Sequence, residues 1–432
     1  MFFRLLKDAF KIKNVRNKIL FTLFIIFVFR IGTHITVPGI NARSLDQLAN
    51  LPFLNMLNLV SGNAMNNFSV FSMGVSPYIT ASIVVQLLQM DIYPRFVEWS
   101  KQGEVGRRKL NQATRYITLV VAFAQSIGIT AGFNALSSVA LVPNATPARF
   151  LLIGAILTTG SMVVVWLGEQ ITDKGFGNGV STIIFAGIIA GIPNMISSIY
   201  QDYFVNISSK EFGHSILMIS LFVLAALIIV FFTTFVQQAE YKIPMQYTKL
   251  AQGAPTNSYL PLRVNPAGVI PVIFASSITT IPSTIIPFFG NRIGWLNNLQ
   301  VALSYQTVSG MAIYAVLIVL FSFFYTFVQV NPEKTAENLQ KNGSYIPSVR
   351  PGKETEDYLT SLLRKLATIG SVFLAVIAIL PIMAQQVFNL SNGIALGGTS
   401  LLILISTGFE GMKQLEGYLL KRRYVGFMNT DD

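Results

Sequence analysis

The sequence predicts an all-α membrane protein whose chain crosses the bilayer ten times, and three observations lead to this fold class. The 432 residues are 52% hydrophobic and 12% charged, and the mean hydropathy is +0.56. Soluble domains carry about 25% charged residues, so this chain has half the usual supply for coating a surface in water. Ten segments reach the roughly 20 apolar residues that a helix needs to cross a bilayer. Lysines and arginines gather on alternate connections between those segments.

The ten apolar segments are spread along the whole chain, and each is expected to form one spanning helix. Residues 216–236 and 311–330 are the most apolar, whereas the last segment is diluted by Gly397, Gly398 and Gly408. The expected spans are 19–37, 74–93, 116–137, 150–169, 180–200, 215–236, 267–289, 308–330, 366–387 and 394–411.

The distribution of basic residues predicts the orientation of these spans. Connections on the N-terminal side of the membrane hold 26 of the 31 lysines and arginines. Because basic loops remain in the cytoplasm, this side and both termini are expected to be cytoplasmic. The net charge of +12 is therefore interpreted mainly as a signal for membrane orientation. A surface that binds nucleic acid is the secondary interpretation of the same charges. The basic connections are 1–18, 94–115, 170–179, 237–266, 331–365 and 412–432.

The residue inventory argues against a catalytic or metal site. The chain has no cysteine, and its two histidines, His34 and His214, lie far apart in sequence, so we expect neither a metal nor a cofactor. No Gly-x-x-x-x-Gly-Lys-Ser/Thr phosphate loop occurs, so energy for transport has to come from a partner. We therefore expect no enzyme. The alternative is a secondary transporter for a small solute, which should show paired charges inside the spans.

One segment between the first two spans does not fit a simple connection. Residues 53–71 are too short and too polar to cross the membrane, because asparagines interrupt the apolar positions. One interpretation is a short re-entrant helix that folds back into the protein, where irregular backbone is tolerated at membrane depth. The other is an amphipathic helix at the outer interface, and the pattern favours neither. The asparagines are Asn55, Asn58, Asn63, Asn66 and Asn67.

Polar residues inside apolar spans form a second group of candidates. Gln86, Gln125 and the pair Ser276-Ser277 lie in the second, third and seventh spans. Such side chains usually hydrogen-bond between helices, with about 0.6–2 kcal/mol per bond. They predict either static contacts between helices or contacts that break when helices separate.

Three basic connections are longer than plain links require. Residues 101–116 contain two glycines, and 331–365 contain an Arg-Pro-Gly turn. Within 237–266, the stretches 240–247 and 258–264 are typical of the strands of a hairpin. Long structured loops on one face predict a docking platform, whereas a purely topogenic role explains their charge but not their length.

The sequence resembles the SecY family of protein-translocation channels over essentially its whole length. The motifs are long and occur in the order found in the family. They are GVSPYITASIVVQLL (74–88), KQGEVGRRKLNQATRY (101–116), DKGFGNGVSTIIFAGIIAG (173–191), NPAGVIPVIFASSI (265–278), VRPG (349–352) and GGTSLLI (397–403).

The resemblance implies an architecture of two inverted five-helix halves, 1–207 and 208–432, around an hourglass pore. It also implies that 53–71 is a re-entrant plug helix, with Asn58, Asn63, Asn66 and Phe68 as plug residues. A ring of isoleucines is implied at the pore waist. Its members would be Ile79, Ile83, Ile184, Ile188 and Ile273, with the tenth-span member left open among Ile405, Thr407 and Gly408.

The resemblance further implies a lateral gate between spans two and three and spans seven and eight, lined by Gln86, Gln125 and Ser277. The implied function is a gated channel in the bacterial plasma membrane that passes unfolded secretory chains and releases apolar segments sideways into lipid. The implied partners are SecE, SecG, the SecA motor ATPase, the ribosome, polypeptides bearing signal sequences, and membrane lipid. The implied docking residues for the motor or ribosome are Arg107, Arg108, Arg263 and Arg350.

Overall fold

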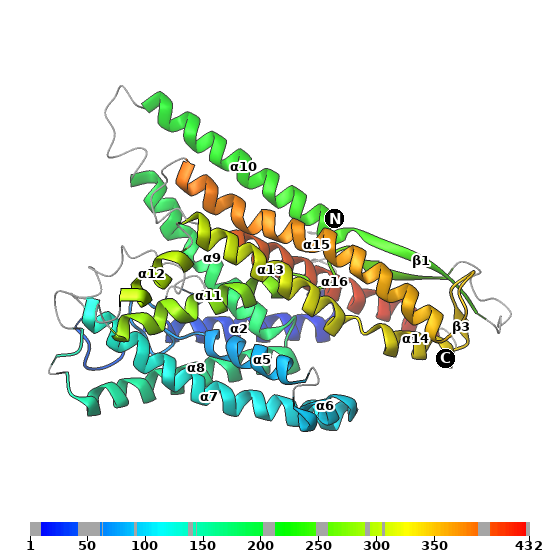
Figure 1. Cartoon of the computed structure of the whole chain (residues 1–432), viewed down its shortest axis with the longest axis horizontal. Helices are drawn as coiled ribbons and strands as arrows, with labels where there is room; N and C mark the ends of the chain where they lie inside the picture. The colour runs from blue at the N-terminus through cyan, green and yellow to red at the C-terminus, as the bar shows by residue number, and fades with distance from the viewer. Residues whose placement is uncertain are drawn as a thin grey trace.

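The computed structural model is a bundle of long helices with a small β-sheet at one end (Figure 1). It describes residues 10–41, 61–62, 64–89, 93–136, 141–143, 145–201, 212–247, 258–289, 294–304, 307–387 and 398–428. The plug prediction for Asn58 and Asn63 falls outside these residues.

In the described residues of the first part, the chain forms five long or apolar helices and one short amphipathic helix. Prolines occupy the first turns of α5, α6 and α8, where a missing backbone N–H costs nothing. After α8, Gly177 takes a left-handed conformation (φ 89°), which lets the chain turn into α9. The helices are α2 (Lys13–Gly32), α5 (Ser76–Leu88), α6 (Pro94–Lys101), α7 (Gly103–Leu136), α8 (Pro147–Lys174) and α9 (Gly179–Tyr200).

Among the described residues, the second part of the chain adds seven helices. Thr307 and Asn331 cap two of them, because their side-chain oxygens accept hydrogen bonds from the backbone N–H groups of Gly310 and Lys334. The helices are α10 (Phe212–Gln238), α11 (Ile270–Phe289), α12 (Gly294–Leu303), α13 (Val308–Gln329), α14 (Pro332–Lys341), α15 (Lys353–Val387) and α16 (Gly398–Met428).

A helix occupies each of the ten segments predicted to span the membrane. Six of them, α7, α8, α9, α10, α13 and α15, are both long and apolar enough to cross a bilayer, by length and composition. The described apolar parts of α5 and α11 are shorter. The chain is therefore a multi-pass helical membrane protein, as predicted.

Side chains on the outside of the bundle are apolar, as lipid requires. On α2, Leu23, Phe24 and Phe27 are exposed, and α10 presents Phe231, Phe232 and Phe235. Of the most apolar window of α10, only 11% is buried, and this helix runs along one edge of the bundle (Figure 1).

The predicted hairpin is present and forms part of a larger body. Strand β1 (Glu240–Tyr247) pairs antiparallel with β2 (Ser258–Arg263), and Glu240 lies opposite Arg263. Strand β3 (Ser344–Tyr345), which the sequence did not predict, adds to the other edge of β1. The connections 237–266 and 331–365 therefore share one sheet. They also share one apolar core, made by Ile243, Leu262, Ile346, Leu359, Leu363 and Leu366.

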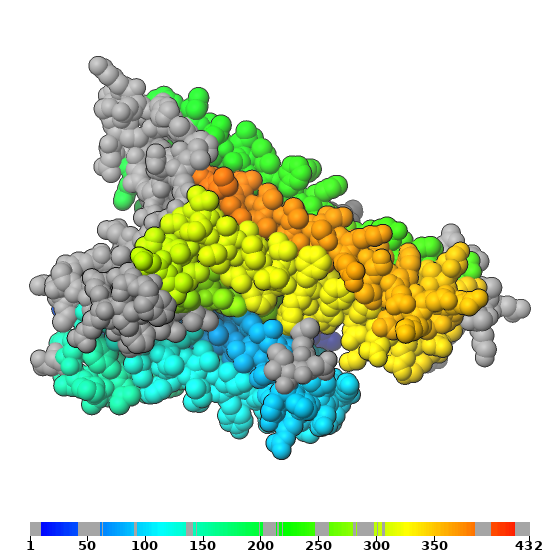
Figure 2. Space-filling view, in the orientation of Figure 1, coloured from blue at the N-terminus to red at the C-terminus, as the bar shows by residue number. Residues whose placement is uncertain are grey.

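Helix packing brings the two parts of the chain together across α11. This helix packs against α13 on one side and against both α5 and α7 on the other. Figure 2 shows α5 and α7 (blue to cyan) meeting the surface formed by α13 and α15 (yellow to orange) across the middle of one face. The line along which α11 meets α5 and α7 is here called the seam. In this structure α11 is in contact with both helices along it.

Candidate functional site

The isoleucines predicted for the ring come together in one cluster at the centre of the bundle. On α5, Ile79 and Ile83 are four residues apart, and on α9 Ile184 and Ile188 have the same spacing. This spacing places each pair on one helix face. All four are between 2% and 7% exposed, and Ile273 of α11 packs against the same cluster. Three helices that are distant in sequence thus contribute branched apolar side chains to one site, called here the isoleucine cluster.

Helix α16 also contributes to the isoleucine cluster, at a position that the sequence did not indicate. Ile403 is buried in it, and Leu404 packs against it. By contrast, a side chain added at Gly408 would meet no atom within 4 Å. The expected candidates were Ile405, Thr407 and Gly408, two to five residues further along the helix. Because every residue from Leu401 to Ile405 is apolar, hydropathy does not reveal which of them faces inward.

Part of the predicted plug segment is buried against the isoleucine cluster. Ala64, Phe71 and Val75 belong to the cluster, and the Phe71 ring stacks on Phe29 of α2, with centroids 6.1 Å apart. Residues 64–75 are thus folded into the protein, which favours the re-entrant interpretation over a helix resting at the interface.

Phe68 takes a different position from the one expected of a plug residue beside the ring. It is fully buried in a second apolar cluster with Met65, Phe133 and Leu157, and its ring contacts Phe133 edge to face, with centroids 6.2 Å apart. Its φ of 40° turns the chain here, so Phe68 and Phe71 enter different clusters. Asn66 of the same segment is exposed.

Hydrogen bonds fasten this segment to its neighbours. The Val37 amide donates to the Phe68 carbonyl (3.0 Å), and the Val70 amide donates to the Ile35 carbonyl (2.9 Å). The Arg30 Nη1 donates to the Gly62 carbonyl at 2.8 Å. This contact gives a partner to the cation that lies inside the first predicted span, and it explains how that charge is accommodated.

The predicted gate residues lie on the helices of the seam, but they do not bond to one another. Gln86 Nε2 donates to Ser82 Oγ on its own helix (3.1 Å), and Ser277 Oγ donates to the Ile273 carbonyl (2.8 Å). Among the residues that the structure describes, no hydrogen bond joins Gln86, Gln125 and Ser277, and the Gln86 Oε1 is buried without a partner. The three predicted gate residues therefore do not form a polar cluster in this arrangement.

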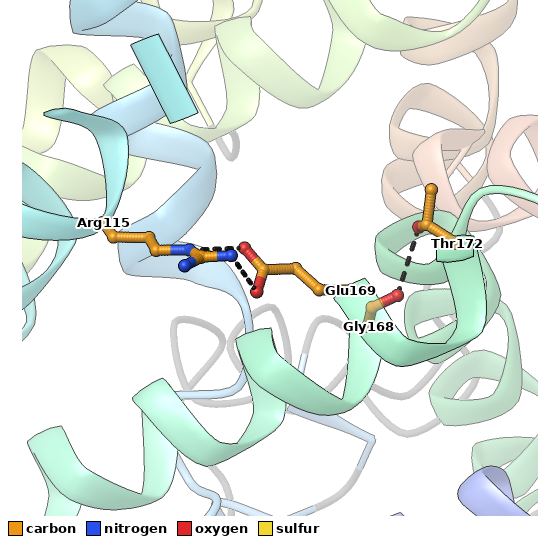
Figure 3. Close-up of polar contacts among 4 residues, drawn as sticks. All are labelled: Arg115, Gly168, Glu169 and Thr172. Atoms are coloured by element: carbon orange, nitrogen blue, oxygen red, sulfur yellow. Dashed lines mark hydrogen bonds and ion pairs between the residues drawn. The ribbon is translucent and has the colours of Figure 1, made fainter. Parts of the chain in front are cut away.

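A bidentate ion pair connects α7 to α8 (Figure 3). Arg115 donates through Nε and Nη2 to the two carboxylate oxygens of Glu169, at 2.8 and 2.7 Å. One turn beyond, Thr172 Oγ1 donates to the Gly168 carbonyl (3.1 Å). The sequence did not predict this pair, because the two residues are 54 positions apart.

Replacing Arg115 with methionine is expected to lower the thermal stability of the protein, because Glu169 would lose both hydrogen bonds. The pair is partly exposed, so the loss should be modest, about 0.5–1 kcal/mol. Thermal unfolding in detergent would measure it. Arg108→Met, on the exposed start of the same helix, is the control and should leave the melting temperature unchanged. An equal effect of the two substitutions would contradict a stabilising role for the pair.

The four arginines predicted to dock a partner are all exposed. Arg107 and Arg108 lie in the first turns of α7, and Arg263 ends β2. The Arg350 side chain is 86% exposed and approaches only Glu354, at 3.9 Å. Their charges are therefore available to a partner.

A second ion pair, which the sequence did not predict, lies at the base of the hairpin. Lys413 Nζ of α16 is 2.7 Å from Glu240 Oε1. The hydrogen bond from Lys413 lowers the pKa of the Glu240 carboxyl, and Arg263 and Lys242 act in the same direction.

This pair predicts a specific pH dependence. Because the pKa of Glu240 is lowered in the folded protein, the stabilisation that the pair provides is complete above the ordinary glutamate pKa of about 4.3. It is lost as the pH falls through the lowered pKa. The difference in melting temperature between the wild type and Lys413→Met should therefore be constant near neutral pH and vanish in acid. A difference that grows on acidification would contradict this.

Within the residues that the structure describes, no three histidine, aspartate or glutamate side chains gather where they could hold a metal ion.

Comparison with known proteins identifies the family. The SecY family model matches residues 69–412. The chain belongs to the SecY family. The protein translocase subunit SecY of Streptococcus gordonii is 70% identical, over 100% of this chain and 99% of that protein. Those of Lactococcus lactis and Bacillus subtilis are 67% and 48% identical, each over at least 99% of both chains.

Solved structures share the fold of this SecY-family chain. One, described as the structure of a protein conducting channel, has a TM-score of 0.63 at 16% identity and covers 93% of this chain and 91% of its own. Sec61 from a canine ribosome–channel complex has a TM-score of 0.59, also at 16% identity, and covers 93% of this chain and 91% of its own. The fold predicted from the resemblance is thereby confirmed as that of the SecY and Sec61 channels.

Proposed function

We propose that this SecY-family chain forms a gated channel that passes unfolded polypeptides across the membrane and releases apolar segments sideways into lipid. The observation that carries the proposal is the isoleucine cluster. Side chains from α5, α9, α11 and α16 meet at the centre of the bundle, with residues 64–75 packed against them. We take the isoleucines as the pore ring and 53–71 as the plug.

The side chains of the isoleucine cluster are suited to block ions at rest and to move apart when a polypeptide passes. Branched apolar side chains exclude water, so a narrow ring of them blocks ions by dewetting. The same side chains hold no fixed polar contacts and can move apart around a passing chain. The chain has no Gly-x-x-x-x-Gly-Lys-Ser/Thr phosphate loop of its own, so the proposal requires an external motor.

The packing of the seam supports sideways release. Ile79 and Ile83 of α5 share one apolar cluster with Phe274 of α11, so separation of these helices breaks apolar contacts. An apolar segment of a passing polypeptide can replace those contacts, so opening toward lipid costs little when such a segment is present. We propose that this seam is the lateral gate.

We propose a bacterial plasma-membrane location with both termini in the cytoplasm, and two inverted halves, 1–207 and 208–432. One observation supports the assignment of the cytoplasmic side. Helices α6 and α14 and the hairpin, all within basic connections, lie at the same end of the bundle in Figure 1. The positive-inside rule assigns that end to the cytoplasm.

The cytoplasmic end offers one docking body. The sheet joins the hairpin to the 331–365 connection, so Arg263 and Arg350 project from a shared scaffold, with Arg107 and Arg108 on α7. We propose that SecA or a ribosome docks here and that SecE and SecG complete the channel. Two structural neighbours are bound to ribosomes, the canine Sec61 complex and a yeast Ssh1 complex.

Pairs of introduced cysteines test the proposal, since the chain has no native cysteine. Cysteines replacing Ala64 and Ile188, both in the isoleucine cluster, are expected to cross-link in resting membranes with a short bifunctional reagent. An arrested translocating polypeptide should abolish that cross-link, because it must pass between them.

The control pair replaces Ser126 of α7 and Thr158 of α8, whose hydroxyl oxygens lie 3.3 Å apart and outside the proposed plug. It is expected to cross-link both with and without substrate. An Ala64–Ile188 cross-link that persists at full yield with an arrested substrate would contradict a path through the cluster.

A further inference from the structure

The end of α16 beyond the last predicted span touches two separate parts of the protein. We call residues Gly411–Tyr418 the linking segment. On one side lie the start of α2 and the turn between α8 and α9, both in the N-terminal half. On the other lies the base of the hairpin.

Contacts with the N-terminal half are both polar and apolar. Gln414 Oε1 accepts a hydrogen bond from the Gly177 amide at 3.0 Å. Leu415 and Val15 are buried together, with Phe176 packed beside them. Lys18 Nζ lies 3.3 Å from the Tyr418 hydroxyl. Gly411 meets Phe176 so closely that a Cβ there would lie 3.2 Å from the ring.

The contact with the hairpin includes one ion pair. Lys413 Nζ lies 2.7 Å from Glu240, the first residue of β1, and both side chains are about two-thirds buried (33% and 27% exposed). Lys413 also lies 5.0 Å from the ring centroid of Phe409, one turn earlier on α16.

The two sets of contacts lie on opposite faces of α16. At about 100° per residue, positions 411, 414, 415 and 418 fall on one side of the helix. Positions 409 and 413 fall about 180° away. The linking segment is therefore placed between the hairpin and the N-terminal half, and it touches each with a different face.

We infer that the linking segment transmits the position of the docking hairpin to the N-terminal half, with Lys413 as the residue that positions the hairpin and Gln414 as the residue that holds the opposite side. This inference rests on the proposed docking role of the hairpin. A partner that moves the hairpin pulls on Glu240 and Lys413, and α16 passes the displacement to Gly177 and α2. Because α16 also supplies Ile403 to the isoleucine cluster, the same helix connects the docking end with the pore.

Spin-label distances in the complete channel complex test this directly. The labels are attached to cysteines that replace Tyr241 of β1 and Val105 of α7, both of which are exposed. The distance between them reports the position of the hairpin relative to the N-terminal half. A single narrow distance distribution is expected in the wild type. Lys413→Met and Glu240→Gln should each broaden it, the double variant should broaden it no further, and Lys413→Arg should keep it narrow.

Gln414→Leu separates transmission from a merely local effect. This residue lies on the face away from the hairpin, so its loss should also broaden the distribution, although the Lys413–Glu240 pair is intact. The matched control is Lys341→Met, which removes an exposed lysine whose Nζ lies 2.7 Å from Glu337 on α14. That control should leave the distribution narrow.

Each outcome decides the inference. Broadening by Lys413→Met and by Gln414→Leu, but not by Lys341→Met, supports it. A narrow distribution in either Lys413→Met or Gln414→Leu overturns it. The rate of motor-driven export is measured on the same samples. If the wild type exports no polypeptide, the proposed function fails, whatever the distances are; if it exports and the distances do not change, only this inference fails.

Discussion

Replacing Ile188 with asparagine is expected to make the resting channel leak ions. Ile188 is 2% exposed and lies in the isoleucine cluster beside Ile184. Burying an isoleucine contributes about 1.5–3 kcal/mol, and a polar amide at this position also stabilises water in the ring. Since 1.4 kcal/mol corresponds to a factor of about ten, the conducting fraction should rise by on the order of tenfold or more. Single-channel recording in planar bilayers would measure it.

Two variants serve as controls for the ring prediction. Ile188→Val keeps a branched apolar side chain and should remain sealed. Ile189→Asn makes the same chemical change one residue further along, at a side chain that is 43% exposed, and should not conduct. If Ile188→Asn stays as tight as the wild type, or if Ile189→Asn leaks equally, Ile188 does not belong to the seal.

Reversing the charge of Arg350 is expected to abolish motor-driven export while the protein still inserts into the membrane. The side chain is 86% exposed and has only a long contact with Glu354, so its loss costs the fold little. Removing one member of a buried interfacial charge pair costs about 2–5 kcal/mol, and a glutamate adds repulsion. Arg350→Glu should therefore weaken motor binding at least about thirtyfold. Binding to membrane vesicles and export of a secretory substrate would be measured together.

The control for Arg350 is Lys334→Glu, which makes the same change of charge on the exposed start of α14, in the same connection. It should reduce binding only slightly, through the overall charge. Normal export by Arg350→Glu would remove this residue from the docking site, and equal losses in both variants would indicate a general charge effect.

Local patterns in the sequence were sufficient for the fold class, whereas the isoleucines proposed for the ring came from the family resemblance. A helix is found at every predicted span, because an uninterrupted apolar run leaves the backbone no other way to satisfy its hydrogen bonds in lipid. The pairs Ile79–Ile83 and Ile184–Ile188 share a face by spacing alone. The hairpin at 240–263 is likewise a local property, set by alternation and turn residues.

The positions that the sequence missed depend on which apolar side chains face protein and which face lipid. Ile403 and Ile405 are equally apolar, yet only Ile403 is in the cluster. Phe68 and Phe71 are three residues apart and enter different clusters. Lipid is as apolar as a protein core, so hydropathy does not distinguish a side chain that faces the pore from one that faces the membrane.

The sequence by itself determined that this chain is a helical membrane protein, how its basic loops are distributed, and which isoleucines can share a helix face. Only the tertiary structure decided which apolar faces meet, that Gln86 and Ser277 bond within their own helices, and that Lys413 reaches Glu240 from 173 positions away. The physical reason is the distance along the chain over which each effect acts. Hydropathy and helical periodicity are set by residues within a few helical turns. A packed interface depends on the shapes and charges of segments that meet only once the chain has folded.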